Sequence, residues 1–486
     1  MKKILILLTS ICIVGYSKAQ TTSIPDSNFE QKLIDLGYDV GIPDGTVPTS
    51  NISDVTSLIV FNEQISDLTG IEDFAALMYL DCGANNLTSL NLTQNGSLTQ
   101  LVCNANSLTG IDLSGNPLLE RINISYNDLT SLDIAPCQNL QLIRAGYNDL
   151  SGISLSQNVN LNHVDLQGNN LGLIDVSSNS NIDTLNVAQC DLSSLDVTNN
   201  TELRSLDFWG NSVTSIDLSQ NTNIVILSCY QNQLTSLDIS ALTELEGLFC
   251  WFNQLTSINS SSNPNLKALS CYNNNITSLD LINNLQLEAL ACEFNNLTAL
   301  DVSNNLLLNQ IRCHDNQIGE LNLSNNSQLF NIKCQNNNLT CLNASTGSSS
   351  TIQTGGFNAN NNPGLSCIEV DDVDWSTFNW INVDPGVSFS LDCNNACSGA
   401  PLSLDSESHV NVFSIYPNPA SSNVIIELRA TDIVEVRLLD LSGRLVMTVR
   451  PERSVVKFNV DAVVSGTYLV QVLTENSVQT QKLLIE

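Results

Sequence analysis

The chain contains 486 residues, of which 17 are basic and 49 are acidic. Without the first nineteen residues, which include three lysines and no acid, its net charge is −35. A field of this sign repels nucleic acid and anionic membrane surfaces, so both are excluded as partners, whereas cations, polar glycans and basic protein patches are not.

The N-terminus has the pattern of a secretory signal peptide. Lys2 and Lys3 precede an apolar run from Ile4 to Val14, and small residues up to Ala19 form a cleavage site. The run is too short to cross a bilayer, and no other segment approaches membrane-spanning length. Residues 1–19 are therefore predicted to be a signal peptide, and the protein is predicted to be exported, with no membrane span.

Residues 20–54 are predicted to form an N-terminal cap. Between Ile24 and Gly37, the apolar residues Phe29, Leu33 and Leu36 recur at helical spacing, which predicts a short amphipathic helix. Such a helix can cover the apolar side that the first turn of a repeat array would otherwise expose.

One pattern recurs every 21 residues without insertion. We number each repeat from an apolar residue at position 0, and a period sustained over thirteen repeats indicates a solenoid, whose repeats bury their apolar sides by stacking. These residues are Leu80, Leu101, Ile122, Ile143, Val164, Leu185, Leu206, Leu227, Leu248, Leu269, Leu290, Ile311 and Ile332.

The consensus LxCxxNxLTSLDLSxNxxLxx resembles the motif of leucine-rich repeat proteins, and the resemblance covers about Val55 to Val370. The first repeat, with DLTGIEDFAALMYL, resembles the internalin type. Alternation places positions 0, 2, 10 and 12 inward. The predicted fold class is mainly β: a leucine-rich repeat solenoid of about 14–15 turns over residues 55–345, with strands on its concave side. The resemblance implies that the asparagine at position 5 bonds to the backbone of the next turn.

Cysteines fall into two groups. Eight occupy position 2, where in-register neighbours stand about 4.8 Å apart, too far for the ~3.8 Å between β-carbons of a disulfide; they are predicted to be buried and unpaired. Four others follow the point where the phase breaks and are disulfide candidates with three possible pairings. The first group is Cys82, Cys103, Cys229, Cys250, Cys271, Cys292, Cys313 and Cys334, and the second is Cys341, Cys367, Cys393 and Cys397.

Beyond the regular repeats, residues 346–397 are predicted to form a last irregular repeat and a C-terminal cap, in which Trp375 and Trp380 cover the last turn. Residues 398–412 are predicted to be a linker. Residues 413–486 alternate apolar and polar side chains, which predicts a small C-terminal β-sandwich with a turn at DLSGR.

The last unit also carries four ordered motifs, YPNPA from Tyr416, LDLSGR from Leu439, GTYLVQV from Gly466 and the terminal KLLIE. Together they resemble the C-terminal sorting domain of type IX secretion substrates. The resemblance implies export across the outer membrane of a Gram-negative bacterium, recognition of residues 413–486 by the secretion machinery, and release or attachment at the cell surface.

Catalytic chemistry is not expected. His163 and His314 are seven repeats apart, roughly 34 Å at strand spacing, and His409 lies in the linker. The sequence contains no GxSxG, HExxH or phosphate-loop motif. The protein is therefore predicted not to be an enzyme and to need no cofactor.

Aromatic residues gather on the outward positions 1, 3 and 4 of successive repeats, where they would form a patch on the concave face. Such a patch can stack on sugar rings or anchor a partner protein, or the rings can simply cover the sheet. The predicted ligand-binding residues are Trp209, Tyr230, Phe249, Trp251, Phe252, Tyr272 and Phe294. Tyr126 and Tyr147, flanked by Arg121 and Arg144, form a second patch.

Position 11 carries a ladder of aspartates, including Asp196, Asp217 and Asp238. Stacked carboxylates repel one another unless cations or hydroxyls intervene. Calcium bound along this ladder, or at Asp371, Asp372 and Asp374, is one interpretation; a hydrated face bonded to neighbouring serines and threonines is the other.

The sequence thus predicts an exported leucine-rich repeat protein that binds a partner protein through its concave face, as an adhesion or adaptor-like module. Two alternatives are a glycan-binding protein that uses the aromatic patch and a cation-stabilised structural protein of the cell surface.

Overall fold

The computed structural model describes residues 20–393 apart from 348 and 354, then residue 397, and residues 413–485 apart from 417–418, 429–432, 441–443, 451–454, 462 and 475–477. The predicted signal peptide, the whole predicted linker with His409, and the turn in DLSGR lie outside these residues. The chain divides into two compact units, Met1–Pro401 and Leu402–Glu486.

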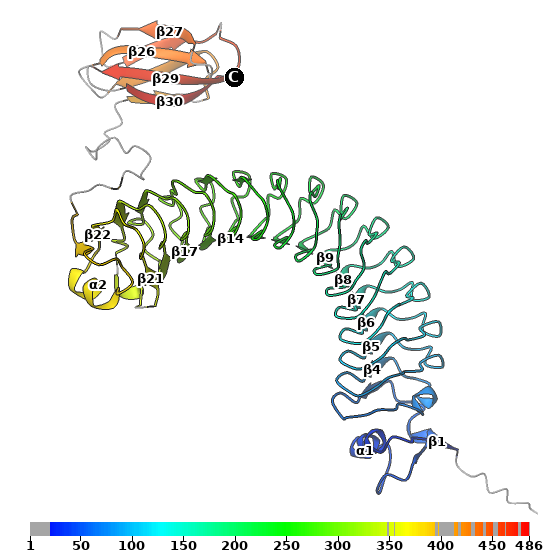
Figure 1. The fold of residues 1–486 in the computed structure, drawn as a ribbon. Coiled ribbons are helices and arrows are strands. Elements are labelled where there is room, and N and C mark those ends of the chain that lie inside the picture. Colours follow the sequence, from blue (N-terminus) through cyan, green and yellow to red (C-terminus); the bar gives the residue numbers. More distant parts are fainter. Residues whose placement is uncertain are drawn as a thin grey trace, which may run out of the picture. The chain divides into compact units, whose positions relative to one another are not determined.

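The first unit is a curved solenoid built on one parallel sheet of 15 strands, which lines the inner side of the arc (Figure 1). The strands are β3 (Ser57–Ile59), β4 (Tyr79–Asp81), β5 (Gln100–Val102), β6 (Arg121–Asn123), β7 (Leu142–Arg144), β8 (His163–Asp165), β9 (Thr184–Asn186), β10 (Ser205–Asp207), β11 (Ile226–Ser228), β12 (Gly247–Phe249), β14 (Ala268–Ser270), β16 (Ala289–Ala291), β17 (Gln310–Arg312), β19 (Asn331–Lys333) and β21 (Phe357–Asn358). The mainly β leucine-rich repeat solenoid predicted from the repeats is therefore confirmed.

The strands pair with no shift in register, so each repeat position forms a ladder along the sheet. Leu227 pairs with Leu248, and Leu248 with Leu269. These position 0 leucines are almost fully buried, and so are the cysteines at position 2. One continuous hydrophobic core therefore runs through all the repeats, as expected when each turn buries its apolar side against the next.

Asparagine ladders satisfy the backbone at the corners. At position 5, the Asn127 side chain donates to the carbonyls of Cys103 and Ile124 and accepts from the backbone N–H of Leu108. Position 15 carries a second ladder, in which Asn116 donates to Leu92. The bonds that link one turn to another run to the preceding turn, whereas the resemblance implied the next turn. They supply partners to carbonyls that the corner would otherwise bury unpaired.

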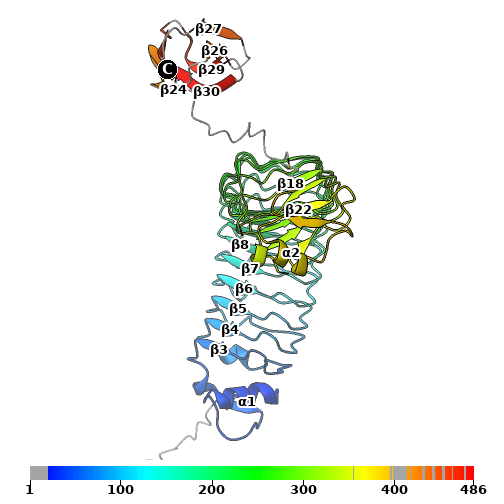
Figure 2. The same ribbon diagram turned by 90° about the vertical axis from the view of Figure 1, so that its left-hand side faces the viewer.

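The N-terminal cap contains α1 (Ser27–Asp35), which lies beyond β3 at that end of the stack (Figure 2). Phe29 and Leu33 are buried, and Phe29 packs on Phe74 of the first repeat. Asp26 caps the helix through one carboxylate oxygen and accepts from Ser66 through the other. The cap is thus bonded to the first turn. Its remaining elements are β1 (Thr21–Ser23), β2 (Thr46–Pro48) and η1 (Thr49–Asn51), and η2 (Ile71–Asp73) follows in the first repeat.

The outer side of the solenoid is mostly turns, with two short sheets. A two-stranded sheet pairs β13 (Ile258–Asn259) with β15 (Leu279–Asp280). A four-stranded sheet near the C-terminal end contains β18 (Glu320–Asn322), β20 (Cys341–Asn343), β22 (Cys367–Glu369) and β23 (Ser388–Ser390).

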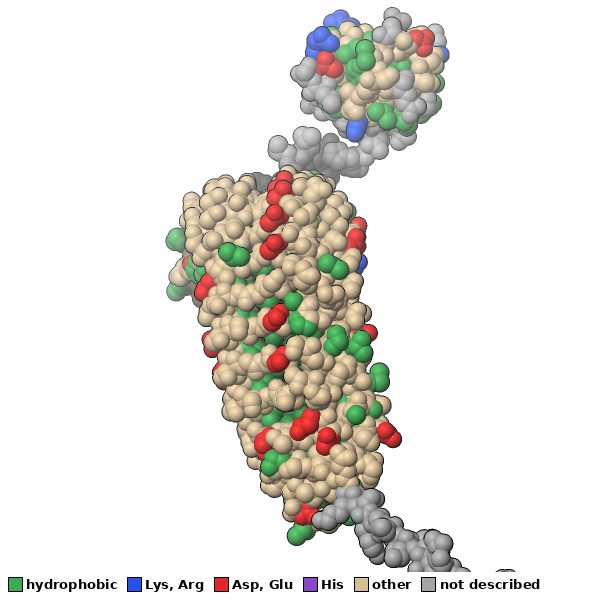
Figure 3. Space-filling view, turned by 90° about the vertical axis from the view of Figure 1, so that its right-hand side faces the viewer, with side chains coloured by type: hydrophobic (Ala, Val, Ile, Leu, Met, Phe, Trp, Pro, Cys, Tyr) green, Lys and Arg blue, Asp and Glu red, His purple; other side chains and the backbone are tan. Residues whose placement is uncertain are grey.

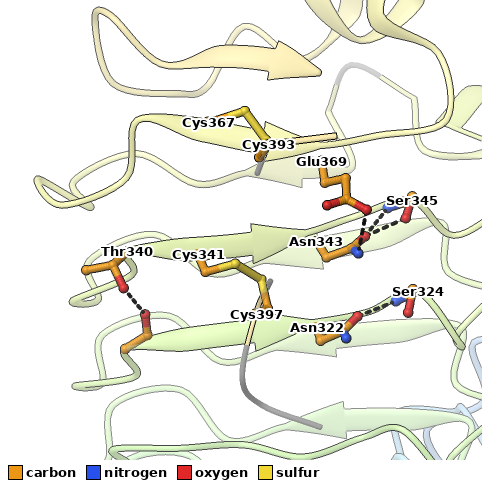
Figure 4. The surroundings of a disulfide bond; sticks show 11 residues. Asn322, Ser324, Thr340, Cys341, Asn343, Ser345, Cys367, Glu369, Cys393 and Cys397 are labelled. Carbon is orange, nitrogen blue, oxygen red and sulfur yellow. Dashed lines mark hydrogen bonds between the residues drawn. A yellow bond between two sulfur atoms is a disulfide. The ribbon is translucent and has the colours of Figure 1, made fainter. Parts of the chain in front are cut away.

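Two disulfides close the C-terminal end of the solenoid. Cys341 on β20 is bonded to Cys397, and Cys367 on the neighbouring strand β22 is bonded to Cys393 (Figure 4). Their Cα atoms are 5.3 and 5.8 Å apart, within the usual range for a disulfide. One of the three possible pairings is therefore present.

Next to this end lie η3 (Ser349–Thr351) and α2 (Val373–Asn379), a helix that the sequence did not predict. The ring of Trp380 is buried, stacks on Phe357 with centroids 4.1 Å apart, and donates its indole N–H to the Ile352 carbonyl. Trp375 packs edge-on against it. Both tryptophans thus lie against the last turn.

The second unit contains two antiparallel sheets. One joins β24 (Phe413–Tyr416), β25 (Asn423–Leu428) and β28 (Val455–Asn459). The other joins β27 (Leu445–Val449), β26 (Ile433–Asp440), β29 (Gly466–Thr474) and β30 (Val478–Ile485). A separate core that includes Phe413, Phe458, Val470 and Leu483 holds them together, which agrees with the predicted small sandwich.

Candidate functional site

Four aromatic rings form a column on the concave face. Trp209, Tyr230, Trp251 and Tyr272 occupy position 3 of four successive repeats, two residues after the ends of strands β10, β11, β12 and β14. Neighbouring ring centroids are 4.9, 3.9 and 5.2 Å apart, and the planes of each pair lie within 13° of parallel. The in-register sheet therefore brings together four residues that are 21 positions apart in the sequence.

The column differs from the expected platform in one respect that affects its chemistry. Its rings stack on one another, so the faces of Tyr230 and Trp251 are both occupied by neighbours. What the inner rings present to solvent is their edges, which carry the positive end of the ring quadrupole. A sugar ring stacks on an aromatic face, so the inner rings do not form the sugar-stacking surface that the sequence suggested.

Three further aromatic residues were expected in the same patch. Phe249 packs edge-on against Trp251, and Phe252 packs edge-on against Tyr272, with centroids 6.0 and 5.7 Å apart. Phe294 instead contacts the ring of His314, with centroids 5.2 Å apart. The structure therefore joins six of the seven predicted aromatic residues in one cluster and places Phe294 at its margin.

An ion pair follows the C-terminal end of the column. Glu293 occupies position 3 of the next repeat, and its side chain is only 3% exposed. It pairs with Arg312, whose guanidinium also lies over the Tyr272 ring, 5.8 Å from its centroid. Burial and the charge of Glu293 raise the pKa of Tyr272. The Glu293–Arg312 pair was missed in the sequence, although the repeat register places both residues beside the column.

Position 4 of every repeat has a left-handed backbone. In most repeats it holds a small or polar residue, but Tyr126, Tyr147, Phe252 and Phe294 also adopt φ values between 51° and 57° there. Bulky residues are rare in this region, which costs of order 1–3 kcal/mol. All four side chains are exposed, from 40% for Tyr147 to 55% for Tyr126, so burial does not offset this strain.

The aspartate ladder lies on the outer side of the solenoid. Figure 3 views that side of the N-terminal half, where acidic side chains recur along its length. Asp196, Asp217 and Asp238 each accept from the backbone N–H two residues later, and these bonds lower the pKa of each carboxyl. Among the described residues, no group of three or more His, Cys, Asp or Glu is arranged to hold a metal ion. Calcium binding here stays a prediction.

The cysteines at position 2 are buried and carry no disulfide. The same is true of Cys137 and Cys190, which stand where the asparagine ladders at positions 15 and 5 have Asn in other repeats. Burial raises the pKa of the Cys103 and Cys334 thiols to about 12. Because the thiolate is the reactive form, burial makes these thiols poor nucleophiles at neutral pH, and they pack in the core.

A polar hollow of about 380 Å³ lies on the concave face, over β6 to β10. Arg144, His163, Asp165 and Asp207 line it together with Tyr126. The second patch expected around Tyr126 and Tyr147 is thus beside this hollow, and the two tyrosine rings stack with centroids 4.5 Å apart. The sequence did not connect His163 with this patch.

Comparisons with known proteins identify the two units separately. Residues 414–486 match the family described as the secretion system C-terminal sorting domain. They therefore form a sorting domain of the type IX kind, and the chain is an exported protein. No helix among the described residues is long and apolar enough to cross a membrane.

The repeats are similar to those of the internalins. Over 81 residues, 17% of this chain, they are 33% identical to internalin J of Listeria monocytogenes serotype 4b. That alignment covers only 9% of the relative's length. By structure, the chain is similar to a functional domain of internalin J from Listeria monocytogenes that includes a cysteine ladder, with a TM-score of 0.66, 24% identity, and coverage of 96% of this chain and 99% of that one.

Two other solved structures share the fold. An internalin from Listeria monocytogenes, internalin F, matches with a TM-score of 0.55 and 20% identity, over 68% of this chain and 94% of its own. A leucine-rich repeat protein of Leptospira interrogans matches with a TM-score of 0.57 and 21% identity, over 70% and 93% of the two chains. These likenesses establish the leucine-rich repeat fold of the solenoid.

Proposed function

Because the chain is an exported leucine-rich repeat protein with a C-terminal sorting domain, we propose that its solenoid binds a partner protein through the concave face, with the aromatic column at the centre of the contact. The observation that carries this proposal is the column itself, the four stacked rings of Trp209, Tyr230, Trp251 and Tyr272. Tryptophan and tyrosine are enriched among the residues that dominate the binding energy of protein interfaces.

Two properties of the column favour recognition over simple coverage of the sheet. Its rings are held by stacking and by the edge-on contacts of Phe249 and Phe252, so a partner meets a surface that is already ordered. Preorganisation lowers the entropy cost of association. Phe252 also keeps an exposed aromatic side chain on a strained backbone, which stability alone does not favour.

The glycan alternative is less well supported, because the inner rings offer edges rather than faces. An adhesion or adaptor-like role remains part of the proposal. The absence of catalysis is also part of it, because His163 lies on β8 and His314 follows β17, and the sheet has eight strands from β8 to β17 inclusive. Delivery by the secretion machinery through residues 413–486 follows from the sorting domain.

The test is a capture experiment with the mature chain. Immobilised wild-type protein and the Trp251→Ala variant are incubated with proteins of the natural surroundings, and the captured proteins are compared quantitatively by mass spectrometry. Phe378→Ala is the matched control, because Phe378 is an exposed aromatic on α2, which does not belong to the concave sheet.

The proposal predicts that one protein is captured by the wild type and by Phe378→Ala, and that its recovery falls at least tenfold with Trp251→Ala. Circular dichroism must show that both variants are folded. Equal capture by all three proteins would reject the column as the binding centre. A glycan array that retains the wild type but not Trp251→Ala would favour the alternative instead.

A further inference from the structure

The polar hollow contains basic side chains that the protein does not neutralise. Residues 20–410 contain only seven basic residues in a region with 41 acids. Lys32, Lys267 and Arg312 form ion pairs, and the Lys333 ammonium donates to the Gly355 carbonyl. The side chains of Arg121, Arg144 and Arg204 have no carboxylate partner among the described residues.

One of these three unpaired arginines, Arg144, lines the hollow, together with a histidine. Arg144 is at position 1 of β7, and His163 begins the neighbouring strand β8. Arg121, on β6, is close enough for its charge to lower the pKa of His163, a smaller effect than burial and the charge of Arg144. The imidazole is half-buried and makes no hydrogen bond with any described residue, so it is a second polar group without a partner.

The other end of the concave face shows the contrasting arrangement. There Arg312 is paired with Glu293, and His314 is bonded to Asp315 with the ring nitrogen 2.7 Å from the carboxylate. The same residue types are thus neutralised internally on one side of the aromatic column and left open on the other. A guanidinium without a carboxylate partner leaves a donor fork available to a ligand.

The acids of the hollow are already engaged by the protein. Asp165 accepts from the backbone N–H of Gln167, and Asp207 accepts from the Ser205 hydroxyl. Asp165 is in register with Arg144 on the next strand, yet the two do not form an ion pair within 4.0 Å. Arg144 and His163 are therefore left as open donors beside acids that already accept hydrogen bonds within the protein.

We propose that the hollow binds a carboxylate side chain of the partner protein, with Arg144 and His163 as its donors. This inference rests on the proposed function, because it specifies the chemistry of the partner: an acidic residue next to an apolar segment that meets the aromatic column. Beyond the Debye length of about 8 Å at physiological ionic strength, the solenoid's other acids are largely screened. The local contest is therefore between the donors Arg144 and His163 and the lining carboxylates Asp165 and Asp207, which already accept hydrogen bonds within the protein.

The test uses small probes, so it does not require the partner. The mature chain is labelled with ¹⁵N-histidine; its sequence has three histidines, and His→Gln variants assign the signals. Blocked tripeptides Ser-Glu-Ser, Ser-Gln-Ser and Ser-Lys-Ser are titrated, with galacturonate as an acidic sugar. The proposal predicts that Ser-Glu-Ser shifts the His163 signal in a saturable way at millimolar concentration, and that His314 does not respond.

Arg144→Gln should weaken this binding at least tenfold, as expected when a charge-assisted bond is lost. Arg204→Gln is the matched control, since it removes the same charge from an exposed arginine that does not line the hollow, and it should change binding less than twofold. The proposal is overturned if Ser-Gln-Ser or Ser-Lys-Ser binds as well, if only galacturonate binds, or if the two arginine variants behave alike.

The two proposals can fail independently. A Trp251→Ala variant that loses its protein partner but still binds Ser-Glu-Ser supports both. If Ser-Glu-Ser does not bind while partner capture still depends on Trp251, the carboxylate site is rejected and the concave-face interaction stands. If Ser-Glu-Ser binds but capture is insensitive to Trp251, the hollow remains a carboxylate site and the role of the column is rejected.

Discussion

The rings of Tyr230 and Trp251 are stacked with centroids 3.9 Å apart and planes 13° from parallel. Trp251 stacks on Tyr272 as well, whereas Trp209 at the end of the column stacks on Tyr230 alone among the described rings. Since an aromatic pair contributes about 0.5–1.5 kcal/mol beyond the area that it buries, Trp251→Ala should lower the free energy of unfolding by roughly 1 kcal/mol more than Trp209→Ala. Urea denaturation followed by circular dichroism measures both, and equal losses would show that the rings do not stack in solution.

Relieving the left-handed backbone at Phe252 should separate stability from binding. Asparagine tolerates this conformation far better than phenylalanine, so Phe252→Asn is expected to stabilise the solenoid by up to about 1 kcal/mol. It also removes an exposed ring that packs on Tyr272, so partner capture should fall. Asn273 already has φ 51° at position 4 of the next repeat, so Asn273→Ala is the control for a change at that position. A variant that loses both stability and binding would contradict the strain interpretation.

Breaking the buried ion pair beside the column should be costly. Arg312→Ala leaves the carboxylate of Glu293 buried without its partner, and such a loss costs about 3–5 kcal/mol in fully buried pairs. Because Arg312 is itself 43% exposed, we expect roughly 2–3 kcal/mol. The double variant Glu293→Gln, Arg312→Ala should regain most of this stability, since it leaves no buried charge. Thermal melts at one ionic strength compare the three proteins, and a double variant no more stable than Arg312→Ala would refute the argument.

The hollow should make stability depend on pH through His163. Burial, followed by the charge of Arg144, lowers the pKa of His163 below its usual 6.5, with Asp165 and Asp183 opposing the shift and Arg121 adding to it. The unfolded chain therefore binds the proton more readily, and this contribution to stability falls as the pH drops through 6.5 and levels off below the folded pKa. In ¹⁵N-histidine titrations, Arg144→Gln should raise the pKa of His163 and Asp165→Asn should lower it further. Shifts in the opposite directions would contradict the arrangement of charges.

The free cysteines should be protected by the fold. All ten are buried, so the folded protein should react with maleimide far more slowly than the chain in guanidinium, where ten thiols become available. Mass spectrometry counts the labels, and the four bonded cysteines serve as the internal control because they react only after reduction. Rapid labelling of Cys229 or Cys250 in the folded state would show that the core opens locally.

Much of this structure could be predicted because the repeat is so regular. Once Leu206, Leu227, Leu248 and Leu269 are aligned, period-two alternation decides which side chains point outward, and the aromatic column follows. Ring orientation could not be predicted, since residues one strand apart can either present their faces or stack, and this depends on side-chain rotamers. For the same reason the sequence did not reveal that Glu293 pairs with Arg312, or that Arg144 leaves Asp165 unpaired.

Helix α2 escaped prediction for a different reason. Its seven residues are too few for a helical period to be recognised, and Asp372 was interpreted as a possible calcium ligand. In the structure its carboxylate accepts from the backbone N–H of Trp375 and caps the helix. A local backbone bond thus accounts for an acid that the composition of the segment alone left ambiguous.

The spacing of the column selects among the shapes that a ligand can have. Its steps of 3.9 to 5.2 Å are set by the distance between strands. An α-helix laid across the strands advances 5.4 Å per turn, which is close to the largest of these steps. An extended peptide repeats the same side only every ~6.6 Å and falls out of phase after one or two rings. The distance between the strands therefore suits a helical segment of a ligand better than an extended one.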